Sequence, residues 1–195
     1  MAAMRDIIQQ ELNAAARLKQ DMAASLTQDI ERAASILIAG LKAGKKVVAF
    51  GNGGSACDAQ HLAAELVGRF GKERKPLAAL ALTGDTSVLT SLGNDYGYGA
   101  VFSRQVSALI QPGDVAMAIS TSGNSENVIQ GVVAARDAGA RTVALLGNDG
   151  GALKDLVDAA VVVPAKQSSR VQEGHISIIH VLCKLVEEAI FGDQG

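Results

Sequence analysis

Two kinds of hydrophobic pattern alternate along the chain. Five short runs are almost continuously apolar, as strands covered on both faces of a sheet are; they span residues 46–50, 78–82, 114–119, 142–146 and 159–163. Between and after them, helical patterns cover residues 55–70, 86–92, 98–110, 125–138 and 151–157. This repeated alternation predicts right-handed crossovers and an α/β fold with an open, doubly wound, five-stranded parallel sheet.

Helical spacing also marks both flanks of the sheet unit. Over residues 1–43 an apolar stripe predicts a helical hairpin before the first strand, and over 168–191 a second stripe predicts one long C-terminal helix. No linker or low-complexity stretch divides the chain, so we expect a single domain over 1–195 with its sheet core at 44–165. Helices appended in this way usually pack on one another or on further copies of the chain.

The composition restricts the class of protein. The chain has 195 residues, of which 48% are hydrophobic and 19% charged, against about 25% charged in an average protein. No apolar run approaches the ~18–20 residues of a spanning helix, and the early residues Asp6 and Glu11 argue against a signal peptide. We therefore expect no membrane association, and a surface that is partly buried against copies of the same chain.

Charge and cysteine usage narrow the setting further. The formal net charge is −2, no basic run is present, and only six residues are aromatic, so nucleic acid is not an expected partner. Cys57 and Cys183 are far apart and show no C-x-x-C spacing. We expect both to be buried thiols of a cytoplasmic protein.

Small polar residues and glycines gather where the predicted strands end. In an open parallel sheet, ligands bind beyond the carboxyl ends of the strands, and the loops there are 51–55, 83–85, 120–125 and 147–151. The loop Ser120–Ser125 combines four hydroxyls, a glycine and a helix N-terminus, which suits a phosphate group. It lacks a Walker lysine and the G-x-G-x-x-G spacing, so a sugar phosphate fits better than a nucleotide. A plain helix cap and turn remains the alternative, and for 147–151 it is the favoured interpretation.

Three ionisable side chains are candidates for chemistry. His61 and Glu65 are four positions apart on one predicted helix face, and His180 lies in the C-terminal helical pattern. An ordinary surface pair would explain the first two, and a satisfied core histidine would explain His180. Spacing alone does not decide between these interpretations.

The combined segments resemble the sugar isomerase (SIS) domain family and, within it, the phosphoheptose isomerases. The resemblance covers essentially the whole chain and rests on four segments: GNGGSACDAQHLAAELVGRF (51–70), SLGNDYGYG (91–99), AISTSGNSENVI (118–129) and SSRVQEGHISIIHVLCKLVE (168–187). It implies a flavodoxin-like SIS fold and the conversion of sedoheptulose 7-phosphate to D-glycero-D-manno-heptose 7-phosphate, in the biosynthesis of heptose for the lipopolysaccharide core.

The resemblance also implies a set of site residues. Carried over position by position, Glu65 and His180 are catalytic, and one Zn²⁺ per subunit is held by His61, Glu65, Gln172 and His180. The substrate-binding residues are Asn52, Gly53, Gly54, Ser55, Glu65, Asn94, Asp95, Ser120, Thr121, Ser122, Ser125 and Gln172. Ser169 departs from relatives that carry an acidic residue there, so we assign no ring-opening carboxylate to it.

Isomerisation between ketose and aldose requires these residue types. A proton must leave the carbon beside a carbonyl and return to its neighbour through an enediol, which a carboxylate base and an imidazole acid accomplish. We therefore expect Glu65 to be the base and His180 the acid. A Glu65 tightly bound to zinc would be a poorer base, and the sequence does not decide whether the metal is catalytic or structural.

A second function belongs to a different class. Some SIS proteins are non-catalytic adaptors that bind the bacterial replication initiator, and such relatives can lose the helix carboxylate; the presence of Glu65 favours the enzyme. The resembling family further implies a homotetramer whose neighbouring subunits share active sites.

Overall fold

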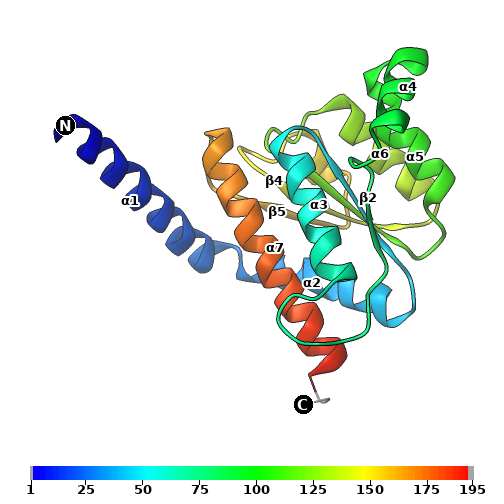
Figure 1. Ribbon diagram of the computed structural model, residues 1–195, viewed down its shortest axis with the longest axis horizontal. Helices are drawn as coiled ribbons and strands as arrows, with labels where there is room; N and C mark the ends of the chain where they lie inside the picture. Colours follow the sequence, from blue (N-terminus) through cyan, green and yellow to red (C-terminus); the bar gives the residue numbers. More distant parts are fainter. Residues whose placement is uncertain (1, 193–195) are drawn as a thin grey trace.

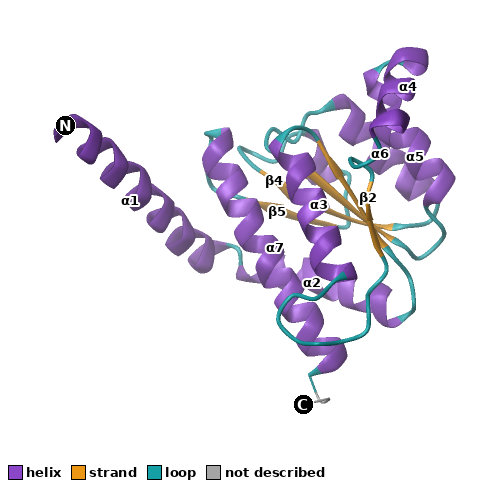
Figure 2. Ribbon diagram, in the orientation of Figure 1, coloured by secondary structure: helices purple, strands orange, loops and turns teal. Residues whose placement is uncertain are grey.

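The computed structural model describes residues 2–192 and contains one five-stranded, fully parallel sheet between two layers of helices (Figures 1 and 2). The strand order is β2-β1-β3-β4-β5. The strands are β1 (Val47–Gly51), β2 (Ala79–Ala81), β3 (Val115–Ser120), β4 (Arg141–Leu146) and β5 (Ala159–Val162). The predicted parallel α/β sheet is confirmed, and each strand lies within a residue or two of its predicted position.

Burial follows the position of each strand in the sheet. Every residue of β1 and β3 is buried, which explains their continuous apolar runs, whereas the edge strand β2 is short and partly exposed. Successive residues of β1 point to opposite faces, with Val47 and Ala49 in one core and Val48 and Phe50 in the other.

Three helices cover one face of the sheet: α2 (Thr27–Lys42), α3 (Gly54–Val67) and the predicted long C-terminal helix α7 (Ser168–Phe191). The helices α3 and α7 lie side by side there, and their contact brings together residues far apart in sequence. This helix pair provides the framework for much of the candidate site.

The opposite face is covered by α5 (Val101–Leu109) and α6 (Glu126–Asp137), with α4 (Thr86–Tyr96) packed beside them. The helix predicted over 151–157 is instead a short 3₁₀ turn, Ala152–Asp155. Gly150 and Gly151 precede it with φ values of 92° and 52°, so neither residue has helical dihedral angles.

The first two helices do not form the predicted hairpin. The helix α1 (Ala2–Ser25) is separated from α2 only by Leu26, whose N–H still bonds to the Met22 carbonyl at 2.9 Å, so the chain bends without reversing. Near the bend, the hydroxyls of Ser25 and Thr27 donate to carbonyls four residues earlier, a contact that bends helices. As a result α1 projects away from the sheet (Figure 1).

Two further observations concern burial and hydropathy. Cys183 is buried as expected, but Cys57 is exposed because it lies on the side of α3 opposite the core residues Ala59 and Leu62. Across residues 2–192, none of the helices combines the length and the apolar character that crossing a bilayer requires.

Candidate active site

The loop after β3 forms a compact hydroxyl-rich turn at the carboxyl edge of the sheet. The Oγ atoms of Ser120 and Ser125 are 3.2 Å apart, and Ser120 Oγ accepts the Gly123 N–H at 3.2 Å. Ser125 is the N-cap residue of α6, yet its side chain makes no capping hydrogen bond. Its hydroxyl and the helix N-terminus are therefore available to an anion.

A second loop supports this turn from behind. Gly123 has a φ of 67°, and a Cβ atom added there would lie 2.0 Å from the Gly150 carbonyl oxygen. The Asn148 side chain donates to the Thr121 carbonyl at 2.9 Å, and the Ala152 N–H donates to Asn124 Oδ1 at 2.9 Å. The loop 147–151 is thus in contact with the loop Ser120–Ser125, called the serine loop below, and fixes its shape.

The helices α3 and α7 bring three ionisable side chains together. His61 Nε2 lies 3.1 Å from His180 Nε2 and 3.2 Å from Glu65 Oε1. The two imidazole rings have centroids 5.1 Å apart, and Phe70 packs on the other side of His180 at 5.7 Å. The His61 and Glu65 side chains are only partly buried, so this cluster is accessible to a small polar ligand.

Gln172 and Gly54 mark a second close approach between the same two helices. A Cβ atom added at Gly54 would lie 2.4 Å from Gln172 Nε2. Glycine at the first turn of α3 therefore leaves the space that the Gln172 side chain occupies. Gln172 and Gly54 lie at the ends of α7 and α3 that face the sheet edge, where the loop after β1 also ends.

Asn52 is tied to a residue that the sequence did not single out. The side-chain amides of Asn52 and Asn127 form two reciprocal hydrogen bonds, each 2.9 Å long, and the Tyr98 hydroxyl donates to Asn52 Oδ1 at 3.2 Å. Asn127 is buried in the first turn of α6. The pair connects the loop after β1 to the helix that begins at the serine loop.

Asn94 and Asp95 are placed apart from the α3–α7 cluster. They lie exposed near the end of α4 and bond to each other at 2.8 Å. Within residues 2–192 no hydrogen bond joins them to another predicted site residue. The remaining predicted residues gather on the loops after β1 and β3 and on α3 and α7.

One buried carboxyl stands beside the cluster. Asp58 lies one turn before His61 on α3, and burial, opposed in part by the nearby His61, raises the pKa of Asp58 to about 6. Its Oδ2 atom is buried with no hydrogen-bond partner among the described residues. The α3 face thus carries two carboxyl groups in different surroundings, Asp58 enclosed and Glu65 partly open.

The side chains of His61, Glu65 and His180 are of the types that bind zinc, but they are not arranged around one point as zinc ligands are. Two imidazole nitrogens and a carboxylate are typical zinc ligands, and His61 contacts both of the others. Over residues 2–192, however, no three His, Cys, Asp or Glu side chains are grouped so that they could hold a metal ion. Gln172, the fourth predicted ligand, contacts Gly54 instead.

The chain is similar over most of its length to proteins named phosphoheptose isomerase. The SIS domain family matches residues 12–147. The phosphoheptose isomerase of Geobacter metallireducens is 53% identical over 96% of this chain and all of its own length. That of Aquifex aeolicus is 58% identical over 84% of this chain and 85% of its own. The structure of the phosphoheptose isomerase of Neisseria gonorrhoeae superposes with a TM-score of 0.90 at 42% identity, covering 95% of this chain and 99% of its own.

Proposed function

The chain belongs to the SIS domain family, and from this premise we propose that it is a sugar-phosphate isomerase that converts sedoheptulose 7-phosphate to D-glycero-D-manno-heptose 7-phosphate in heptose biosynthesis. The relatives named phosphoheptose isomerase support this assignment. The structural observation that carries it is the contact of His61 with both Glu65 and His180, formed between α3 and α7. The serine loop lies at the carboxyl edge of β3, and β3 is paired with β1, the strand that leads into α3.

The serine loop is the proposed phosphate site. Ser120, Thr121, Ser122 and Ser125 supply hydroxyls, and the N-terminus of α6 supplies N–H groups and the positive end of its dipole. Phosphate held there anchors one end of the open-chain sugar. Its binding energy then aligns the reacting carbons with the side chains on α3 and α7.

Glu65 and His180 are the proposed base and acid. Glu65 removes a proton from C1 of the ketose while His180 donates a proton to the carbonyl oxygen at C2, which gives an enediol. His180 then accepts the proton of the C1 hydroxyl, and Glu65 returns its proton to C2, which gives the aldose. His61 Nε2 lies within 3.2 Å of both side chains and is thus placed between the base and the acid.

Zinc remains a proposal based on donor chemistry. The candidate ligands are His61, Glu65, Gln172 and His180, and their side chains would have to converge further on the ion, because no three His, Cys, Asp or Glu side chains of residues 2–192 are grouped for one. When bound, the metal would polarise substrate oxygens, which assists proton removal from the adjacent carbon. We also propose that the enzyme acts in the cytoplasm and supplies heptose for the lipopolysaccharide core.

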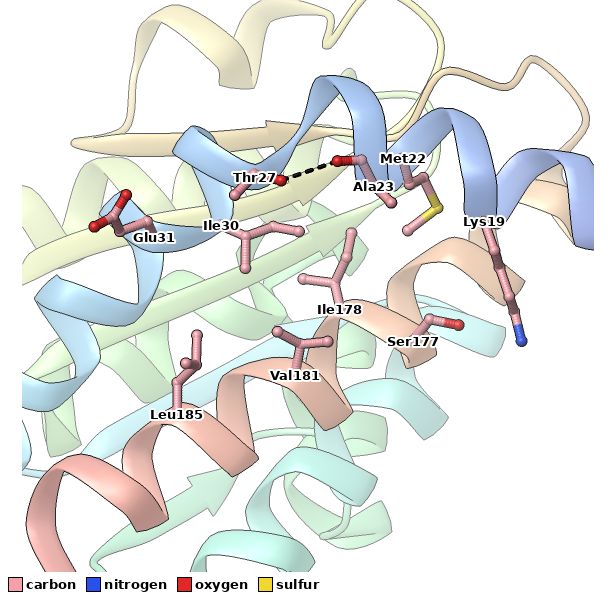
Figure 3. A pocket seen from close by; sticks show the side chains of 10 residues that line it. All are labelled: Lys19, Met22, Ala23, Thr27, Ile30, Glu31, Ser177, Ile178, Val181 and Leu185. Atoms are coloured by element: carbon pink, nitrogen blue, oxygen red, sulfur yellow. Dashed lines mark hydrogen bonds between the residues drawn. The ribbon is translucent and has the colours of Figure 1, made fainter. Parts of the chain in front are cut away.

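A homotetramer is the proposed assembly. Exposed apolar side chains line the outer part of α1, among them Ile7, Ile8 and Leu12. A cavity of about 670 Å³ lies between the bend joining α1 to α2 and the outer face of α7, where Met22, Ile178 and Leu185 point into it (Figure 3). Copies of the same chain would cover both surfaces and bring neighbouring subunits to the site. A monomeric mass at micromolar concentration, measured by light scattering, would contradict this.

The function is tested by incubating the protein with sedoheptulose 7-phosphate and detecting the aldoheptose phosphate. We expect Glu65→Gln and His180→Gln to lose about 100-fold or more of turnover while remaining folded. Glu73→Gln, which changes an exposed carboxylate just beyond α3, is the matched control and should retain activity. Normal turnover in Glu65→Gln would remove the proposed base.

The adaptor alternative is not favoured, because the phosphoheptose isomerases of Geobacter metallireducens and Aquifex aeolicus are 53% and 58% identical to this chain. It predicts a different outcome in the same experiment. No conversion by the unchanged protein, with or without added zinc, together with tight binding to a replication initiator, would reverse the assignment.

A further inference from the structure

A buried ion pair lies behind the candidate active site, between the loop after α3 and the outer half of α7. Arg74 Nε donates to Glu187 Oε1 at 3.1 Å, and each side chain is only 1% exposed. The loop that carries Arg74 leaves the end of α3 and curves beside α7 before it enters β2 (Figure 2). Arg74 and Glu187 are called the Arg74–Glu187 clamp below.

Both oxygens of the Glu187 carboxylate accept hydrogen bonds from the loop. Oε1 also accepts the Phe70 N–H at 2.9 Å, and Oε2 accepts the N–H groups of Gly71 at 2.9 Å and Lys72 at 3.1 Å. Burial alone would raise the pKa of Glu187, but these backbone donors and Arg74 outweigh it and lower the pKa below its ordinary value. The carboxylate is therefore ionised and fixes the path of three consecutive loop residues.

Arg74 connects this carboxylate to the helix that carries Glu65. Its Nη2 donates to the Glu65 carbonyl at 2.7 Å and its Nη1 to the Leu66 carbonyl at 2.8 Å. These carbonyls belong to the last turn of α3, where no further helical N–H is available to them. The guanidinium thus joins the backbone of Glu65 to Glu187 on α7.

The clamp reaches His180 along two routes. Glu187 lies seven residues after His180, two turns along the same helix. In addition, Phe70, whose N–H is held by Glu187, packs its ring against the imidazole of His180 with centroids 5.7 Å apart. One buried pair therefore contacts the backbone of the proposed base and the backbone of Phe70, whose ring packs against the proposed acid.

We propose that Arg74 and Glu187 are positioning residues for the isomerisation: they touch no reacting atom, and they set the relative placement of Glu65 and His180 across the α3–α7 contact. This inference rests on the proposed function for its kinetic effect. It concerns the geometry of the base and the acid and not the phosphate site, because among residues 2–192 no hydrogen bond joins the clamp to the serine loop. A loss in kcat with little change in KM is therefore the expected signature.

The test compares Glu187→Gln with Glu188→Gln, its neighbour on α7. Glu188 is exposed and, within the described part of the chain, pairs only with the lysines at 72 and 184, so its substitution controls for the loss of a carboxylate. Glu187→Gln places an NH₂ group against backbone N–H donors, and we expect kcat to fall by about tenfold or more with KM kept within about twofold. Arg74→Lys keeps the charge without the guanidinium fork and should lose less; it is the second variant if Glu187→Gln does not fold.

A readout independent of turnover comes from the three histidines of the chain. In imidazole ¹H–¹⁵N spectra of the full-length proteins, Glu187→Gln should shift the signals of His61 and His180 and leave that of buried His175 in place. Glu188→Gln should shift none of them.

The inference is overturned if kcat and the His61 and His180 signals are the same in Glu187→Gln as in Glu188→Gln, even with a lower melting temperature, because the pair then only stabilises the fold. If the unchanged protein has no isomerase activity, the proposed function fails, and the imidazole signals still decide whether the clamp sets the geometry of the cluster.

Discussion

The buried histidine on α7 should make stability depend on pH. His175 is fully buried, and its Nε2 donates to the Leu146 carbonyl at 3.0 Å. Its Nδ1 has no hydrogen-bond partner among the described residues. Protonation would therefore place both a charge and an unpaired N–H in the core, which is costly.

The size of this effect can be worked out. Burial, opposed in part by the bond to Leu146, lowers the pKa of His175 from 6.5 to about 4. Because the pKa in the folded state is below that in the unfolded state, the unfolded chain binds a proton more readily. The stabilisation is then fully present above pH 6.5 and is lost as the pH falls toward 4, by about 3 kcal/mol at pH 4.

The measurement is the free energy of urea unfolding between pH 7.5 and pH 4, for the unchanged protein and for His175→Gln. A glutamine amide can still donate to Leu146 but takes up no proton. The contributions of groups that titrate in both proteins cancel in the difference between the two unfolding free energies. The packing cost of the substitution is the same at every pH, so it shifts that difference by a constant. We expect the difference to change by about 3 kcal/mol in favour of the variant as the pH falls. A difference that stays constant would refute the reasoning.

Two glycine substitutions should separate substrate binding from catalysis. Gly123→Ala places a new Cβ 2.0 Å from the Gly150 carbonyl oxygen, on a residue with a left-handed backbone. The backbone strain is about 1–2 kcal/mol, so we expect a distorted serine loop. Steady-state kinetics should then show a KM raised about tenfold. Gly54→Ala displaces the flexible end of Gln172, 2.4 Å away, and should lower kcat while changing the unfolding free energy by less than about 1 kcal/mol. Gly84→Ala, where nothing lies within 4 Å, is the control; a Gly123→Ala protein that behaves like it would show that the support of the serine loop is not rigid.

The sequence was most informative where one physical cause acts locally. Strands buried on both faces require continuous apolar runs, so β3 and β4 could be predicted to within a residue. The helical stripes over 1–43 identified which faces are apolar, but they contain no information about the angle between two helices. The bend at Leu26 depends on hydroxyl contacts near it, and those leave no hydrophobic signature.

In the candidate site, too, the residues that could be predicted are those whose partners are close in sequence. The serine loop could be predicted because a helix N-terminus and its hydroxyls are adjacent in sequence. His61 and Glu65 could be predicted as a pair from their helical spacing, and their contact with His180 is a long-range result of packing. Asn127 and Glu187 were not predicted. In the sequence Asn127 is an ordinary polar residue within a helical pattern, and Glu187 lies 113 positions from Arg74, its partner in the ion pair.

The strand order also constrains how the protein folds. The strand β1 pairs with the central strand β3, and the residues just before the two strands, Lys46 and Asp114, are joined by a hydrogen bond across 68 positions. The clamp requires a closure of 113 positions. The entropy of closing such long loops is lost before the contacts form, which slows folding. Refolding on a timescale of about milliseconds to seconds is expected, with the α3–α7 contact, and so any isomerase activity, recovered only after the central strands have paired.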